Sequence, residues 1–205
     1  MQNIFFDTRI LDKKSREKFY LTEELMMENA AQELESCVMP HVFHESSRYI
    51  NRPCVLILAG RGNNGADGYV LARRLSCHDF CVAVCCIGEP SSEIAKVQKK
   101  RAELLGVSFI SPYDLDSFVE EKSFDISVVV DCVYGSGFHL PLDAESEAVI
   151  QSANKIEAFK VSCDVPSGLD SDGNGKIVFR ADETVAMGAL KLSLFSDKAK
   201  DFCEK

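Results

Sequence analysis

Residues 55–75, VLILAGRGNNGADGYVLARRL, limit the possible folds of this chain more than any other segment. The apolar residues 55–59 predict a buried strand, and a loop with four glycines follows. An amphipathic helix is then predicted over residues 65–77. Glycines let the backbone approach a ligand closely, and a helix N-terminus offers unpaired N–H groups to an anion. The segment therefore predicts a strand–loop–helix unit with a ligand at its loop.

The same alternation of strand and helix patterns continues along the chain. Further strands are predicted at residues 80–87, 107–110, 126–130, 159–163 and 183–187, and helices at 92–105 and 142–154. Two helices precede the first strand, one over residues 8–20 and one that begins after Thr22. Continuous β-branched runs are typical of strands buried on both faces. We therefore expect a single α/β domain over residues 1–205, with a three-layer, doubly wound, mostly parallel, Rossmann-like sheet and two N-terminal helices.

Composition excludes several classes of protein. The net charge of −9 and the pI near 5.0 argue against a nucleic-acid partner, which needs a basic face. No apolar run approaches the roughly 20 residues of a membrane span. The nine cysteines lie mostly in apolar runs without metal-like spacing, and the N-terminus lacks a signal-peptide pattern. We therefore expect reduced, structural cysteines and a cytoplasmic protein.

Two more polar loops follow predicted strands, at residues 131–141 and 164–175. Each begins with an aspartate, Asp131 or Asp164, directly after a buried strand, where an unpartnered charge is costly. Either aspartate alone is compatible with a helix cap or a turn. Because the carboxyl ends of parallel strands share one edge of a sheet, both loops are expected to meet the glycine loop there. Together they predict an active site.

These motifs, in this order, resemble the YjeF N-terminal family, the NAD(P)H-hydrate epimerases. The resemblance covers nearly the whole chain, from MENAA at 27–31 through GRGNNGADG, VVVDCVYGSG and CDVPSG to the lysine of GALKLS. It implies interconversion of the R and S forms of hydrated NADH and NADPH at C6 of the nicotinamide ring. The nucleotide is then a substrate, and an ATP- or ADP-dependent dehydratase restores the cofactor.

The resemblance also implies roles for individual residues. Substrate-binding residues would be Asn63, Asn64, Gly65, Ala66 and Asp67 in the first loop, and Gly135, Ser136, Gly137, Phe138, His139, Leu140 and Pro141 in the second. Asp164 matches the acidic residue at the reacting end of the substrate, and we predict that it is the catalytic acid or base. Asn64, Asp131 and Ser167 match the ligands of one potassium ion, in keeping with the oxygen ligands that hard cations prefer. Lys191 matches a family lysine that either meets the ligand or lies in solvent.

One residue departs from the family pattern, because Ala66 stands where the family usually has glycine. An alanine is acceptable there if the local φ is negative. Two routes of proton transfer are compatible with the sequence, since inversion at C6 can proceed by loss and return of water or by opening of the ring. We further expect a homodimer, a dehydratase partner that is fused or separate, and no membrane partner. The chain is then either a whole epimerase or the front part of a bifunctional protein.

Two other functions remain as alternatives. The spacing Gly60-x-Gly62-x-x-Gly65 satisfies the dinucleotide fingerprint of NAD(P)-dependent oxidoreductases. Such an enzyme needs an acidic residue at the end of the second strand, and Glu89 is imperfectly placed for that role. The second alternative is a non-catalytic nucleotide- or RNA-binding module, which the acidic net charge and the presence of both aspartates disfavour.

Overall fold

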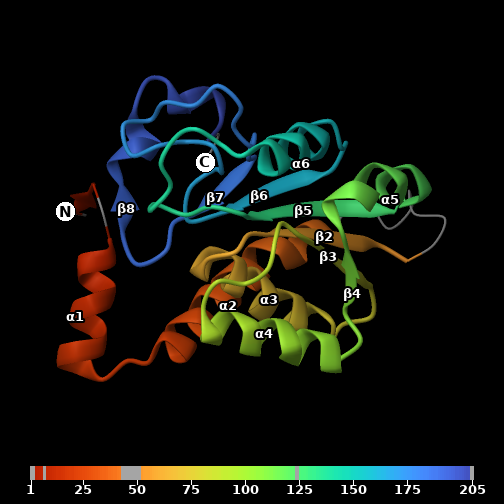
Figure 1. Ribbon diagram of the computed structural model, residues 1–205, viewed down its shortest axis with the longest axis horizontal. Coiled ribbons are helices and arrows are strands. Elements are labelled where there is room, and N and C mark those ends of the chain that lie inside the picture. Colours follow the sequence, from red (N-terminus) through yellow and green to blue (C-terminus); the bar gives the residue numbers. More distant parts are fainter. Residues whose placement is uncertain (1–2, 7, 43–51, 123–124, 204–205) are drawn as a thin grey trace.

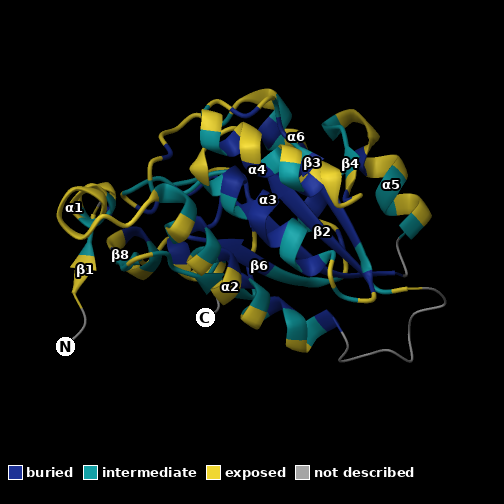
Figure 2. Cartoon of the chain, turned by 90° about the horizontal axis from the view of Figure 1, so that it is seen from below, coloured by how far each residue is buried: buried dark blue, intermediate teal, exposed yellow. Residues whose placement is uncertain are grey.

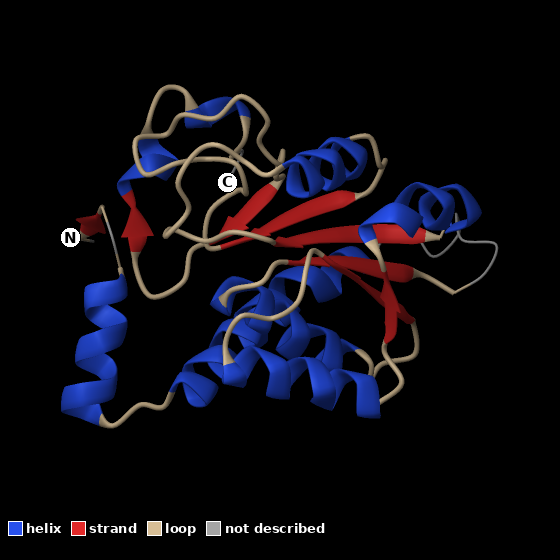
Figure 3. Ribbon diagram, viewed as in Figure 1, coloured by secondary structure: helices blue, strands red, loops and turns tan. Residues whose placement is uncertain are grey.

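The computed structural model describes residues 3–6, 8–42, 52–122 and 125–203. Its centre is a six-stranded, wholly parallel sheet (Figures 1 and 3). The strand order is β4 (Ser108–Ile110), β3 (Cys81–Cys86), β2 (Cys54–Ala59), β5 (Ile126–Cys132), β6 (Phe159–Cys163) and β7 (Glu183–Val185). The chain runs outward from β2 in one direction and from β5 in the other. The expected doubly wound α/β fold is confirmed.

Helices cover both faces of this sheet and complete three layers (Figure 1). One face carries α2 (Glu23–Val42), α3 (Asn63–Leu75) and α4 (Glu93–Leu104), and the other carries α5 (Leu115–Lys122) and α6 (Ala144–Asn154). Alternate residues of β2 enter the two cores: Ile57 packs with the first group of helices and Leu56 with the second. Both residues are fully buried, so solvent is excluded from both faces of the sheet at this strand.

The N-terminal elements lie at the edge of the molecule. The two-residue strand β1 (Ile4–Phe5) pairs in parallel with β8 (Leu190–Lys191), away from the main sheet. Helix α1 (Arg9–Phe19) has no buried residue and stands to one side of the body (Figures 1 and 2). Short 3-10 helices lie at Pro112–Asp114, Leu192–Phe195 and Ala199–Asp201. No helix in the described ranges is both long and apolar enough to cross a bilayer.

The structure corrects several expected boundaries. Helix α3 begins at Asn63 rather than at residue 65, because the N–H of Ala66 donates to the carbonyl of Gly62 at 3.1 Å and closes a first turn. Strand β5 extends through Asp131 instead of ending before it. The sequence patterns did not predict α5, β1 or β8. Asn63 and Asn64 therefore belong to a helix and not to a loop.

Two glycines hold this turn close to the sheet. A Cβ on Gly65 would lie 1.9 Å from the carbonyl oxygen of Gly60, and one on Gly60 would lie 2.1 Å from the carbonyl oxygen of Val133. No side chain fits at such distances, so both positions require glycine. The close approach brings the first turn of α3 against the loop that follows β5.

Candidate functional site

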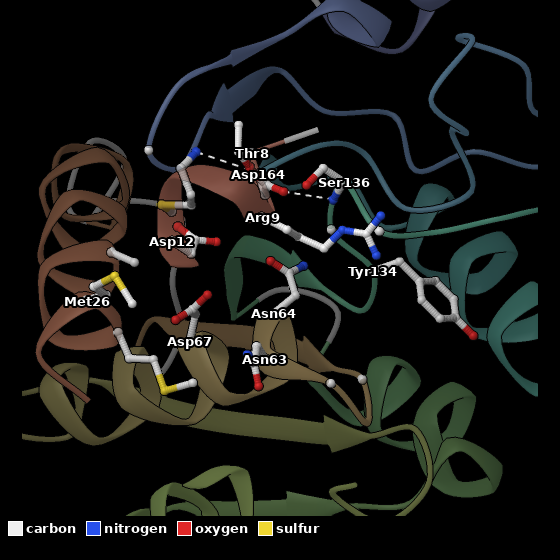
Figure 4. A pocket seen from close by; sticks show the side chains of 18 of the residues that line it. Thr8, Arg9, Asp12, Met26, Asn63, Asn64, Asp67, Tyr134, Ser136 and Asp164 are labelled. Carbon is white, nitrogen blue, oxygen red and sulfur yellow. Dashed lines mark hydrogen bonds between the residues drawn. The ribbon is translucent and has the colours of Figure 1, made fainter. Parts of the chain in front are cut away.

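A cavity of about 1300 Å³ opens at the carboxyl ends of β2, β5 and β6. This is the switch point of the sheet, where doubly wound folds bind their ligands. Loops after these strands form one wall, and α1 with the first half of α2 forms the other (Figure 4). The volume exceeds the roughly 300–1,000 Å³ of ordinary small-molecule sites. A dinucleotide therefore has room to bind.

Most of the expected substrate-binding residues line this cavity. They are Asn63, Asn64, Asp67, Gly135, Ser136, Gly137, Phe138, His139, Pro141 and Asp164. Gly65 and Ala66 are buried beneath the surface of the first turn of α3 and do not line it. Leu140 is 42% exposed and borders a separate hollow near Gly173. Of the five residues predicted in the first loop, the three with polar side chains line the cavity.

Ala66 fits the helix without strain. It is fully buried within α3, and the only non-glycine residues with positive φ in the described ranges are Tyr20 and Asp164. Because the position has ordinary helical geometry, glycine is not required there.

Asp164 lies at the end of β6 in an unusual backbone conformation, with φ at 75°. Aspartate tolerates this left-handed region better than most residues, and strained residues of this kind concentrate at functional sites. Its carboxylate accepts hydrogen bonds from the backbone N–H groups of Ser136 at 2.8 Å and Met187 at 3.2 Å. The strand end, the second loop and the segment after β7 therefore meet at this one side chain.

The same carboxylate forms an ion pair with Lys191, which is 1% exposed. The ammonium group also donates to the backbone carbonyl of Met187. Of the two readings that the sequence allowed for this lysine, the solvated one is wrong. A buried cation next to the cavity thus pairs with the Asp164 side chain and orients it.

Asp131 lies behind the cavity wall and is fully buried. Its oxygens accept from the N–H and hydroxyl of Ser167, at 2.7 and 2.6 Å, and from the N–H of Val133 at 3.1 Å. Burial raises the pKa of Asp131 to about 6, although the hydrogen bonds from Ser167 and Val133 oppose that rise. Among the residues that the structure describes, no ion pair reaches this carboxyl group. It is a buried acid held by neutral donors.

Asn64 connects the first loop to the other two. Its amide nitrogen donates to the carbonyl of Cys163 at 3.4 Å. A Cβ on Gly135 would lie 3.5 Å from the amide oxygen of Asn64 and 3.0 Å from a carboxylate oxygen of Asp164. Asn64, Gly135 and Asp164 are thus in close proximity, and glycine at 135 leaves them that space.

The oxygen donors expected for potassium gather at these strand ends. They are an amide at Asn64, a carboxylate at Asp131 and a hydroxyl at Ser167, and the last two are hydrogen-bonded to each other. Hard monovalent cations favour such ligands. The buried Asp131, which has only neutral partners, has the charge that a cation would balance. The residues present fit the ion in chemistry.

Asp67 projects from α3 into the cavity, where Figure 4 shows its carboxyl group facing the same space as those of Asp12 and Asp164. The side chain keeps partial access to the cavity. Removal from water raises the pKa of Asp67 well above its usual range, and the negative charges of Asp164 and Asp12 raise it further. The cavity therefore contains an acid that loses its proton less readily than an exposed aspartate.

Other lining residues were not predicted from the sequence. Thr8, Arg9 and Asp12 come from α1 and the residue before it, Met26 from α2, and residues 185–188 from the segment after β7. Residues 8–12 carry no quoted motif, and the MENAA and GALKLS motifs beside the other segments did not indicate that they line the cavity; only packing between distant segments brings them to the strand ends. The only local hint that α1 faces the cavity is that Arg9 and Asp12 lie one helical turn apart, on the same side of the helix.

The fold and the site together define a doubly wound α/β protein with a nucleotide-sized cavity at its switch point. The model of one family, "YjeF-related protein N-terminus", matches residues 23–193. This chain belongs to that family. The match leaves α1 outside, although α1 forms part of the cavity wall.

Named relatives agree with this assignment. The chain is 37% identical over 203 residues to a Helicobacter pylori protein named "Bifunctional NAD(P)H-hydrate repair enzyme Nnr", covering 98% of this chain and 41% of the relative. It is 35% identical over 162 residues to an Oenococcus oeni "NAD(P)H-hydrate epimerase", covering 76% and 73% of the two chains. The chain thus spans less than half the length of its bifunctional relative.

A solved structure supports the fold independently. The crystal structure of the yeast protein YNL200c superposes with a TM-score of 0.80 at 21% identity, covering 94% of this chain and 83% of the yeast chain. At that identity the likeness concerns the fold alone.

Proposed function

We propose that this chain interconverts the R and S epimers of hydrated NADH and NADPH at C6 of the nicotinamide ring. The observation that carries the proposal is Asp164, which lies at the switch-point cavity and is oriented by Lys191 and two backbone donors. Inversion at a carbon that bears a hydroxyl and adjoins nitrogen needs a positioned acid or base. The names of the Helicobacter and Oenococcus relatives support the same reaction.

Charges in the cavity favour one orientation of the substrate. Asp67 and Asp164 place two carboxyl groups at one end of the cavity, which suits proton transfer at the nicotinamide ring. Arg9 and Arg61 lie on the cavity wall, and Nη1 of Arg9 is 3.8 Å from the place of a Cβ on Gly137. We place the phosphates beside these arginines, with the reacting carbon beside Asp164.

We also propose that Asn64, Asp131 and Ser167 hold one potassium ion. When bound, the ion would supply positive charge to the buried Asp131 carboxylate and join the three strand-end loops. Potassium removal should then lower both stability and activity, while the chain's own residues perform the proton transfers.

Replacing Asp164 tests the proposed reaction. Asp164→Asn keeps the shape and loses the base, so epimer exchange should fall by at least about 100-fold, the lower range for general acid–base catalysis. Asp116→Asn makes the same chemical change on the exposed side of α5 and should leave exchange unchanged. Circular dichroism verifies that both variants are folded. Near-normal exchange by folded Asp164→Asn would reject the assignment.

The oxidoreductase alternative has less support. It needs an acidic residue at the end of β3 that reaches the nucleotide, yet the Glu89 side chain is 88% exposed and pairs with Lys99. Glu89 is also outside the set of described residues that line the cavity. An oxidoreductase would consume NADH with a carbonyl substrate, whereas an epimerase leaves NADH absorbance unchanged.

Two partners follow from the proposal. A dehydratase acting on one epimer is the enzyme that consumes the product, and the bifunctional name of the Helicobacter relative supports that coupling. We also propose a homodimer, because β1, α1 and Phe6 between them expose apolar side chains: Ile4, Phe6, Ile10 and Phe19 are 48–67% exposed. Light scattering should give twice the chain mass, and the double variant Ile10→Glu, Phe19→Glu should give the single mass.

A further inference from the structure

We propose that Asp67 is the proton donor of the reaction and Asp164 its proton acceptor. In the resting enzyme the first carboxyl group is protonated and the second is ionised. This inference rests on the proposed epimerase function. Three observations carry it: where Asp67 points, what surrounds it, and the contrast between it and Asp164.

Helix α3 aims Asp67 at the reacting end of the cavity. Gly68 lets α3 pack directly on the sheet, since a Cβ there would lie 2.9 Å from Cβ of Cys132 and 3.2 Å from Cγ2 of Ile57. The residue before it then stands over the strand ends. In Figure 4, Asp67 lies across the cavity from Asp164, with Asp12 between them in this view, and Met26 from α2 lines the same cavity. A ring bound between these two carboxyl groups has one on each side.

The surroundings of Asp67 differ from those of Asp164. Asp164 has a lysine and two N–H donors, which stabilise a carboxylate. Among the described residues, no hydrogen bond or ion pair reaches the carboxyl group of Asp67. A carboxyl group with no donor, a partly apolar wall and two acidic neighbours is suited to holding its proton until a substrate atom takes it.

The titratable groups that face Asp67 come from several elements. They are Asp12 on α1, Asp164 after β6, and the thiols of Cys132 on β5 and Cys163 on β6. The acidic residues that α2 directs at α3 are already paired further along the helix: Glu28 with Arg73, and Glu35 with Arg74. Lys191 on β8 is paired with Asp164. The groups closest to Asp67 therefore favour its neutral form.

The chemical step balances when the ring opens. Asp164 accepts the proton of the C6 hydroxyl, the oxygen forms a carbonyl at C6, and the C6–N1 bond breaks with its electron pair moving to N1. N1 then takes the proton of Asp67. Rotation about C5–C6 turns the aldehyde over. As N1 attacks its other face, N1 returns a proton to Asp67, and Asp164 returns one to the oxygen.

This cycle oxidises and reduces nothing. Both carboxyl groups recover their starting states after each turnover, so the same resting enzyme serves both directions. In loss and return of water, Asp67 would give its proton to the leaving hydroxyl group and Asp164 would take one from the water that adds to the other face. Asp67 would then end the turnover without a proton and Asp164 with one. The opposite environments of Asp67 and Asp164 therefore favour ring opening between the two routes.

The test separates catalysis from binding. With hydrated NADH of one C6 configuration as substrate, Asp67→Asn should lower kcat by at least about 100-fold and change KM by less than about 3-fold. Asp116→Asn is the matched control and should behave as wild type. A folded Asp67→Asn variant with normal kcat, or one with raised KM and unchanged kcat, would overturn the inference. Absence of exchange in the wild type would instead overturn the proposed function.

A pH profile gives a second readout that does not depend on the folding of that variant. In the wild type, kcat/KM should fall on the alkaline side as Asp67 loses its proton. Asp12→Asn removes one nearby negative charge and should move this alkaline limb to lower pH. An unchanged alkaline limb in Asp12→Asn would contradict the role of Asp67, and a shift to lower pH would support it.

Discussion

The pair formed by Lys191 and Asp164 allows a quantitative prediction about stability. The two side chains are buried, with Lys191 1% and Asp164 7% exposed. Lys191→Met preserves most of the volume and removes the cation. Breaking a buried pair by removing one partner costs about 3–5 kcal/mol, because the other charge is left without compensation. Asp164→Asn leaves the ammonium group in the same position and should cost a similar amount.

The double variant separates this interaction from simple damage. Two independent losses would sum to about 6–10 kcal/mol, whereas joint removal of a buried pair is often close to neutral. We expect a cost of no more than about 3 kcal/mol for Lys191→Met, Asp164→Asn, and hence a coupling free energy of at least about 3 kcal/mol. The exposed pair of Lys200 with Asp197 provides the control, and Lys200→Met should cost less than about 1 kcal/mol.

Urea unfolding followed by far-UV circular dichroism measures these free energies, since the chain contains no tryptophan. Single losses of this size leave the variants folded in water if the domain has the usual stability of about 5–15 kcal/mol. Single-variant costs that add in the double variant to within about 0.5 kcal/mol would refute the ion pair and, with it, the orientation of Asp164 by Lys191.

Three further predictions concern the strand ends. Gly65→Ala places a methyl group 1.9 Å from a backbone oxygen and should lower the free energy of unfolding in urea by about 3 kcal/mol. In Gly62→Ala the new methyl group meets no atom within 4 Å, and the loss should be about 0.5–1 kcal/mol. Equal losses in the two variants would contradict the packing. Ala66→Gly should destabilise helix α3 by about 1 kcal/mol and leave epimer exchange intact, and a gain in stability would be inconsistent with an ordinary helical position. The pKa of Asp131 is about 6 in the folded protein, which is above its value in the unfolded chain. The protonated side chain therefore contributes its full stability below about pH 4, and about 3 kcal/mol of stability is lost as the pH rises through 6. Potassium chloride should therefore raise the melting temperature, relative to choline chloride, more at pH 7 than at pH 5, and an equal effect at both would refute the proposed ion.

Local patterns predicted the central part of this structure well. The alternation of strand and helix patterns predicted the parallel sheet, because strands buried on both faces consist of continuous apolar residues. Asp131 and Asp164 were expected to meet the glycine loop, and the order of β2, β5 and β6 places all three ends together. The start of α3 was misplaced because the asparagines of its first turn resemble a loop in composition.

The rest of the cavity depends on contacts between distant segments. Arg9 and Asp12 lie on a helix with no buried residue, so no apolar stripe marks which side faces the site. Lys191 is separated by 27 positions from Asp164, and neither residue type reveals that the two form a buried pair. The environment of Asp67 likewise arises only when α1, α3 and the end of β6 meet.

The central claim is tested most directly by the exchange of purified epimers. Wild-type protein in potassium buffer is incubated separately with the R and the S form of hydrated NADH, and both forms are separated chromatographically over time. The account predicts that both incubations reach the same ratio of epimers, at an initial rate proportional to protein concentration and without formation of NADH. Folded protein that leaves the rate of exchange equal to that in buffer alone would contradict it.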